Sequence, residues 1–141
     1  MTSFARNPEE MVRTADAIVL IRNEQVFGRS DAGKLVDDPE MRTGFGAKHG
    51  VYAICRVTAV LYGAEQGVAV GDTHEITLWR AGIITLKHAY SRQGEESIQF
   101  LRRGEQGLQP LYSEAGTLPL HWLEEVQAWI VQHKTPAPSA N

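Results

Sequence analysis

The sequence predicts a mainly β fold, an antiparallel barrel with a short N-terminal helix and a C-terminal amphipathic helix. The strongest observation is the run 51–62, Val-Tyr-Ala-Ile-Cys-Arg-Val-Thr-Ala-Val-Leu-Tyr, which is dominated by β-branched and aromatic residues. Strands usually have about 5–6 residues, and we expect one of this length to curl around a barrel. The run 74–80 alternates in strand fashion, and the run 17–27 begins as a continuous apolar stretch.

The composition indicates one globular domain that needs neither a metal nor a disulfide to fold. With 141 residues, 43% of them hydrophobic and 22% charged, the chain is long enough to bury a core of its own. We expect a single domain over 1–134 and a solvated, proline-containing tail over 135–141. A formal net charge of −3 argues against a nucleic-acid partner, because such proteins usually carry a basic stripe. The composition does not indicate an oligomeric state.

Two compartments remain open. No run approaches 18 apolar residues, so no segment is expected to span a membrane. Residues 1–20 do not resemble a signal peptide, because Arg13 and Asp16 interrupt the only apolar run. We expect a periplasmic or cell-envelope protein if a leader has been removed, and a cytoplasmic protein otherwise.

The N-terminal part predicts a capped helix, a strand and then a long connection. Asn7 is a suitable N-cap and Pro8 suits the first helical position, and we expect the helix to end at Asp16. The strand 17–27 follows. Residues 28–50 are polar and contain five glycines, and a connection of this length without structure is uncommon and often functional.

Further strands and a helix are expected in the second half. The run 83–86 fits a short strand or part of a loop, and 98–103 and 108–113 fit a hairpin with its turn at 104–107. Residues 117–120 mark the entry to the C-terminal helix, with Pro119 near its first turn. One apolar face of this helix is expected to pack across the barrel; it consists of Trp122, Leu123, Val126, Trp129 and Ile130.

The order of these patterns resembles a known family. The residues that carry the resemblance are 15–19, Val57-Thr-Ala-Val-Leu-Tyr-Gly63, Gly71-Asp72 before Glu75-Ile-Thr-Leu, and 94–101. Over about residues 8–114 the chain resembles bacterial small domains of unknown function, whose fold is similar to the inhibitory domain of tissue inhibitors of metalloproteinases. The resemblance implies an OB-like, five- to six-stranded antiparallel barrel. Those inhibitors chelate zinc through an N-terminal cysteine, which this chain lacks, so no functional residue is carried over.

Few residue patterns suggest chemistry. The run 28–35 nearly matches a phosphate-binding loop, but Leu35 replaces the hydroxyl that would bind Mg²⁺. Asp37, Asp38 and Glu40 lack the regular spacing of a Ca²⁺ loop and fit a solvated acidic loop. No histidine lies in a zinc-binding pattern, although His74 and His88 flank one expected hairpin. We therefore expect no cofactor and no metal.

The single cysteine is expected to be structural. By alternation Cys55 shares a face with Val51, Ala53, Val57 and Ala59, and a free cysteine on such a face behaves as a small apolar residue. The sequence contains no Gly-x-Ser-x-Gly motif for a catalytic serine, and its adjacent glutamates are poor candidates for a coupled acid–base pair.

The resulting hypothesis is a non-enzymatic module that binds a protein partner, such as an inhibitor or an immunity-type protein. It would use the connection 28–50 and the rim of the barrel. The residues expected to contact the partner are Arg29, Lys34, Asp37, Asp38, Arg42, Phe45 and Lys48. The alternative is an OB-type protein that binds single-stranded nucleic acid, with Tyr52, Tyr62, Trp79 and Tyr90 stacking on bases. A third and weaker alternative is a small hydrolase that uses Asp37, Asp38 or His49.

Overall fold

The computed structural model describes residues 7–30, 32–43, 49–79, 84–111 and 116–134. Phe45 and Lys48, which were expected to contact a partner, lie outside these residues. The first half contains α1 (Pro8–Thr14), β1 (Ala17–Arg29), β2 (Leu35–Val36), β3 (Gly50–Tyr62), the 3₁₀ turn η1 (Ala64–Gln66) and β4 (Thr73–Trp79). The second half contains α2 (Leu86–Ala89), η2 (Tyr90–Arg92), β5 (Glu96–Gly104), β6 (Gly107–Pro110), β7 (Thr117–Pro119), η3 (Leu120–Trp122) and α3 (Leu123–Lys134).

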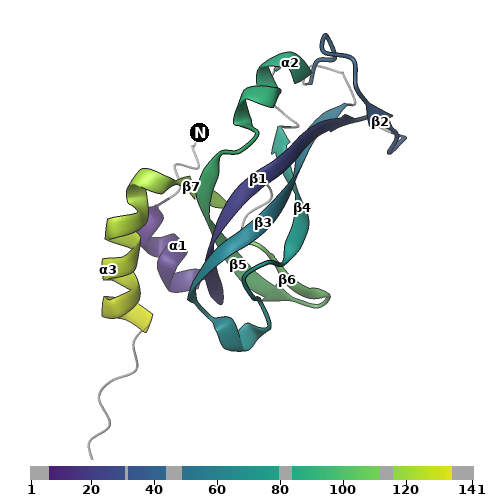
Figure 1. Cartoon of the computed structure of the whole chain (residues 1–141). Helices are drawn as coiled ribbons and strands as arrows, with labels where there is room; N and C mark the ends of the chain where they lie inside the picture. The colour runs from purple at the N-terminus through teal and green to yellow at the C-terminus, as the bar shows by residue number, and fades with distance from the viewer. Residues whose placement is uncertain (1–6, 31, 44–48, 80–83, 112–115, 135–141) are drawn as a thin grey trace, which may run out of the picture.

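The strands form one antiparallel sheet, and the predicted mainly β class with two flanking helices is confirmed. Five strands are ordered β4-β3-β1-β5-β6, while β2 pairs with the end of β1 and β7 pairs with β5. Figure 1 shows the sheet bent along the long strands β1 and β3, with α1 and α3 together on one side. No pairing joins β4 to β6 among the described residues, so closure into a barrel stays a prediction.

The bending has a local cause in the pairing of β1 with β3. The register shifts at three places along these strands. At one of them Leu20 pairs with Ala59 and Ile21 with Val57, which leaves Thr58 as an extra residue in β3. Such β-bulges bend a strand and increase its twist. The bulge also shifts the side-chain alternation, so that Val60 packs against the inner core where Ala59 was expected.

Two apolar clusters lie on opposite faces of the sheet. The inner cluster contains Val19, Ile21, Val51, Ala53, Cys55, Val57, Ile76 and Leu101, with Met41 and residues of α2 above them. The outer cluster contains Ile18, Ile98 and Phe100 of the sheet, packed against Met11 and Val12 of α1 and Val126 of α3. The expected apolar face of the C-terminal helix therefore does pack on the sheet, and the structure adds that it does so on the outer face, beside α1. Neighbouring residues of β1 are buried on both faces, and the outer face needs the two helices as its cover.

The two helices are joined to each other at their ends. Asn7 Oδ1 accepts a hydrogen bond from the backbone N–H of Glu10 at 3.2 Å, which confirms the expected N-cap of α1. His133 Nε2 lies 2.7 Å from Glu9 Oε2. Lys134 Nζ donates to the backbone oxygens of Arg13 and Ala15 at 2.7 and 2.9 Å. α1 ends at Thr14, two residues before Asp16, because Ala15 has already taken an extended conformation.

Several expected boundaries are corrected. The described part of 28–50 contains regular structure, since β1 continues to Arg29, β2 follows, and β3 begins at Gly50. Within 83–86, Leu86 begins a helix instead of ending a strand, after Thr85 caps it with a hydrogen bond to the His88 N–H. Residues 117–119 form the edge strand β7, while Pro119 directly precedes η3, which leads into α3, so Pro119 does lie near the first turn of the C-terminal helical segment. β6 ends at Pro110, because proline has no backbone N–H that could donate a hydrogen bond to a neighbouring strand.

Candidate functional site

The first candidate surface is the hairpin that β2 forms with the end of β1, where β1 also still pairs with the beginning of β3. We call residues 28–36 the hairpin arm. Within it Gly28 pairs with Val36 and Arg29 with Leu35. The Ser30 N–H donates to Lys34 O at 2.9 Å, and the turn is completed by Gly33, whose φ of +82° suits glycine. Figure 1 shows the arm projecting at the upper right, far from α1 and α3.

Arg29 braces the hairpin arm against the neighbouring strands. Its Nη2 donates to Glu75 Oε1 of β4 at 2.8 Å, and its Nη1 donates to Gly33 O at 3.0 Å. The guanidinium carbon lies 5.1 Å from the centre of the Phe27 ring, a cation–π distance. Phe27 in turn stacks on Tyr52, with 6.0 Å between ring centres. Arg29 was expected to contact a partner, but its donors already serve to hold the arm in place.

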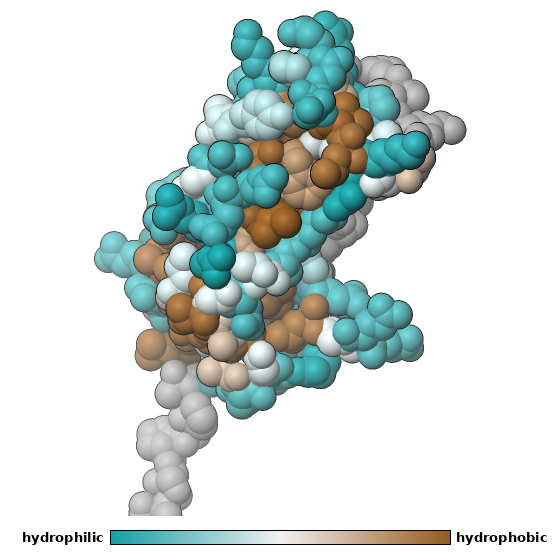
Figure 2. All heavy atoms as spheres, turned by 45° about the vertical axis from the view of Figure 1, so that its right-hand side comes forward, coloured by the Kyte–Doolittle hydropathy of each residue, from teal (hydrophilic) through white to brown (hydrophobic). Residues whose placement is uncertain are grey.

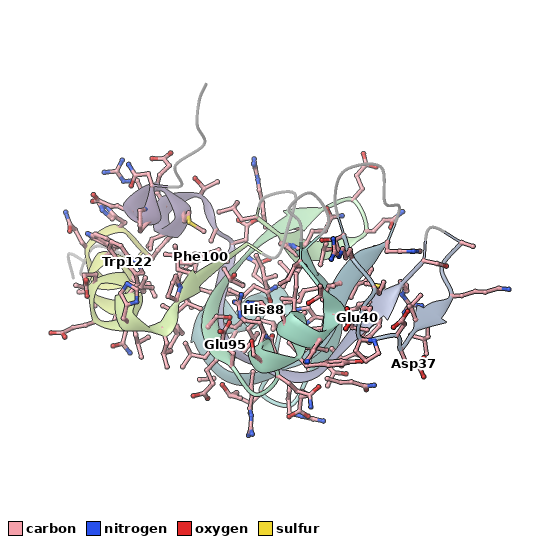
Figure 3. The ribbon with its side chains drawn as sticks, turned by 90° about the horizontal axis from the view of Figure 1, so that it is seen from above. Asp37, Glu40, His88, Glu95, Phe100 and Trp122 are labelled. Carbon is pink, nitrogen blue, oxygen red and sulfur yellow. The ribbon has the colours of Figure 1, made fainter. Side chains whose placement is uncertain are left out.

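The other predicted contact residues that are described lie in or directly after the arm. Lys34 is exposed in the turn. Asp37 and Asp38 are also exposed, and Asp38 Oδ1 accepts from the Glu40 N–H at 3.0 Å, which forms a local turn. Arg42 is exposed and its backbone forms an isolated bridge with Thr85. Figure 3 places Asp37 at one end of the molecule and Trp122 at the other.

The most exposed large apolar side chain of this region was missed from the sequence. Leu35 is 71% exposed on β2, where it pairs with Arg29 of the braced arm. Figure 2 shows hydrophobic surface in this upper part of the molecule, surrounded by hydrophilic side chains. An apolar residue surrounded by charges resembles the centre and rim of a protein interface.

The second candidate surface is a groove of about 480 Å³ between the two ends of the sheet. One wall is formed by 73–75 of β4 and the other by 107–110 of β6. Val68, Leu101 and Leu108 are its apolar lining. Its volume lies in the range of about 300–1,000 Å³ that is usual for ligand pockets. The sequence had placed no functional residue here.

A polar pair links the two sides of the sheet beside this groove. His74 Nε2 of β4 lies 2.7 Å from Gln99 Oε1 of β5. Gln99 is fully buried and faces the inner cluster together with Leu101. Because an unpaired amide in a core is costly, the contact with His74 stabilises Gln99 there. His88 was the suggested partner of His74, but it is exposed on α2.

Cys55 occupies the same interior and is not poised for catalysis. Its side chain is fully buried, and Sγ donates to the backbone oxygen of His74 at 3.3 Å. Burial raises the pKa of the Cys55 thiol to about 12, with its backbone hydrogen bond acting weakly in the opposite direction. The thiolate is therefore scarce near neutral pH, although it is the nucleophilic form.

We expect Cys55 of the folded protein to react slowly with a soluble aromatic disulfide reagent at pH 8. Unfolding in urea exposes the thiol and returns its pKa to the ordinary range, so the rate should rise by about a hundredfold or more. The release of the coloured thiolate, followed by absorbance, measures both rates. Equal rates in buffer and in urea would contradict the burial of Cys55.

The described residues contain no cluster suited to a metal ion. No three described histidine, cysteine, aspartate or glutamate side chains come together as a metal site needs. His133 contacts Glu9, and His121 packs on the ring of Trp122 with 5.8 Å between ring centres. Among the described helices, none combines the length and apolar character needed to cross a bilayer.

Comparison with models of known protein families and with curated proteins finds no significant match to this chain.

Proposed function

We propose that this protein is a non-enzymatic module that binds a partner protein through the hairpin arm. The observation that carries the proposal is Leu35, an apolar side chain that is 71% exposed on β2 of a braced hairpin, opposite Arg29. Burying it against a partner would remove apolar area from water, which favours association. Because Arg29 already links the arm to Glu75, the arm loses little conformational entropy when a partner binds.

The charges around Leu35 support a protein partner of mixed polarity. Lys34 precedes Leu35, and Asp37 and Asp38 follow it, all three with exposed side chains. A rim that contains both signs of charge favours one orientation of a partner and adds to specificity.

We also propose that the sheet is an OB-like barrel left open between β4 and β6. The path of five strands, the three register shifts and the inner apolar cluster support strong curvature. Two side-chain contacts span from the β3–β4 side to β5. They are the pair His74–Gln99 and the hydrogen bond of 2.8 Å from Arg103 Nε to Gln66 Oε1 of η1.

Binding of single-stranded nucleic acid has less support. Two arginines of the long strands are paired with carboxylates: Arg56 of β3 with Glu24 of β1 at 2.9 Å, and Arg29 of β1 with Glu75 of β4 at 2.8 Å. Such pairing removes the positive potential that phosphates require. Fluorescence anisotropy with single-stranded oligonucleotides at low salt tests this alternative. Binding at micromolar protein concentration would support it.

Replacing Leu35 by glutamate is expected to weaken partner binding by about tenfold or more, because the new charge would be buried without a partner. Proteins captured from a cell extract by the wild-type protein are identified by mass spectrometry. Their affinities for Leu35→Glu are then measured.

Val131→Glu is the matched control for this experiment. Val131 is 68% exposed on α3, at the opposite end of the molecule. The control should bind like the wild type, and both variants should keep the wild-type Tm. Unchanged affinity of Leu35→Glu for every captured protein would rule out the arm as the binding surface.

A further inference from the structure

The groove between β4 and β6 is bordered by two strand edges that lack a second neighbour. Among the described residues β4 pairs only with β3, and β6 pairs only with β5. In an antiparallel pair, every second residue of an edge strand directs its N–H and C=O away from its neighbour. Both edges therefore present backbone donors and acceptors towards the groove, and an extended chain is the natural complement of such groups.

Of the two edges, β4 is the better acceptor for an added strand. It has seven residues, Thr73–Trp79, none of which is proline. β6 has four residues and ends in Pro110, which lacks an N–H. Short edges and prolines are usual protection against unwanted pairing, and here only β6 is protected in this way.

The lining of the groove suits the side chains of such a strand. Val68 and Leu101 are nearly buried at its base, and Leu108 is half-buried on the β6 wall. Alternate side chains of an added strand would point to this apolar base, while the others would point to solvent.

The charges of the groove indicate which side chain the added strand carries. Arg103 is exposed on the inner face of β5, and its Nε and Nη2 donate to Gln66 Oε1 and Gln66 O at 2.8 and 2.7 Å. Both acceptors are neutral, and no ion pair joins Arg103 to another described residue. The two carboxylates that line the groove have other partners: Glu75 forms an ion pair with Arg29, and Asp72 accepts a hydrogen bond from the Ala69 N–H at 2.9 Å. The positive charge of Arg103 is therefore available to a ligand.

We propose that the groove binds an extended segment of a partner protein, which pairs with the free edge of β4 and places an acidic side chain against Arg103. The inference rests on the proposed function for the existence of a partner protein, and it adds the conformation and the charge of the bound segment. The hairpin arm supplies a separate contact, because its brace on Glu75 lies on the same strand without filling the groove.

The test uses a phage-displayed library of random heptapeptides selected against the full-length protein. The selected sequences are then synthesised with fluorescent labels. We expect alternating apolar residues with aspartate or glutamate at one fixed position. Methylation of alternate backbone nitrogens should weaken binding by about tenfold or more, because it removes the pairing with β4. Peptide-dependent protection of β4 amides from hydrogen exchange should accompany binding.

Two arginine variants test the charge. Arg103→Glu should lower the affinity for the acidic peptides by about tenfold or more, because two negative charges would then lie next to each other. The same variant should bind peptides in which lysine replaces the acid. Arg102→Glu is the matched control, because Arg102 lies next to Arg103 but on the opposite face of β5, and it should change affinity less than about twofold.

Three results would overturn the inference. They are failure of the library to yield peptides that protect β4, equal affinity of the acidic peptides for Arg103→Glu and the wild type, and equal affinity of N-methylated and unmodified peptides. A concentration-dependent dimer that is lost in Arg103→Glu, detected by light scattering, would instead assign the groove to a second copy of the chain. Leu35→Glu should leave peptide binding unchanged, so failure here is distinguished from failure of the arm.

Discussion

Replacing Gly63 by alanine is expected to lower the free energy of unfolding by about 3 kcal/mol or more. Gly63 follows β3 with a φ of +87°, a conformation that costs an alanine about 1–2 kcal/mol. A Cβ at this position would also lie 2.4 Å from Asp16 O and 2.8 Å from the Cα of Ala17. Both are backbone atoms at the start of β1, and neither can rotate away. Urea denaturation followed by tryptophan fluorescence measures the loss.

Gly67→Ala is the matched control for Gly63→Ala. Gly67 has a φ of +98°, but no heavy atom lies within 4 Å of a Cβ built on it. Its substitution should cost only the backbone strain of about 1–2 kcal/mol. The difference between the two variants therefore measures the close approach of the turn to β1. Equal losses would mean that the turn is not packed against Asp16 and Ala17 as described.

The second large effect is expected for Phe100→Ala, which should cost about 3–5 kcal/mol. Phe100 is among the largest fully buried side chains and lies on β5 in the cluster that the two helices cover. Its removal leaves a cavity that α1 and α3 cannot fill, because their ends are tied together by His133, Lys134 and Glu9. Figure 3 shows Phe100 on the side of the molecule where Trp122 lies, away from Asp37.

Two comparisons make the Phe100 prediction specific. Phe100→Leu should cost clearly less than the alanine variant, because more of the volume is kept. Val131→Ala, on the exposed side of α3, should change the free energy of unfolding by less than about 0.5 kcal/mol. A loss below about 1 kcal/mol for Phe100→Ala would indicate that the helices do not pack on this face of the sheet.

Several features of the fold followed from local sequence patterns. The length of β3 is encoded in its own run 51–62, which is dominated by β-branched and aromatic residues, and needs no knowledge of distant parts. The beginning of α1 is set by Asn7 and Pro8, which act on the first helical turn. The hairpin turn between β5 and β6 follows from Gly107, whose φ is +108°. Each of these signals acts within a few residues of its position, so periodicity and capping rules detect it.

The candidate surfaces were only partly accessible to such reasoning. The connection 28–50 was recognised as special, and Arg29, Lys34, Asp37 and Asp38 lie in or beside the hairpin arm. Nothing local indicated that Arg29 would be bound by Glu75, 46 positions further along the chain. The exposure of Leu35 was equally hidden, because exposure depends on what the rest of the chain leaves uncovered.

The amino-acid sequence by itself determined the mainly β class, the extents of the long strands, the capped N-terminal helix and the glycine turns. Only the tertiary structure decided the face on which α3 packs, the placement of β4 and β6 along one groove, and the meeting of His74 with Gln99 across 25 positions. Local patterns set the φ, ψ and burial preference of single segments. Register, bulges and cross-sheet contacts arise from pairing between distant segments, and these determine which side chains remain available for a partner.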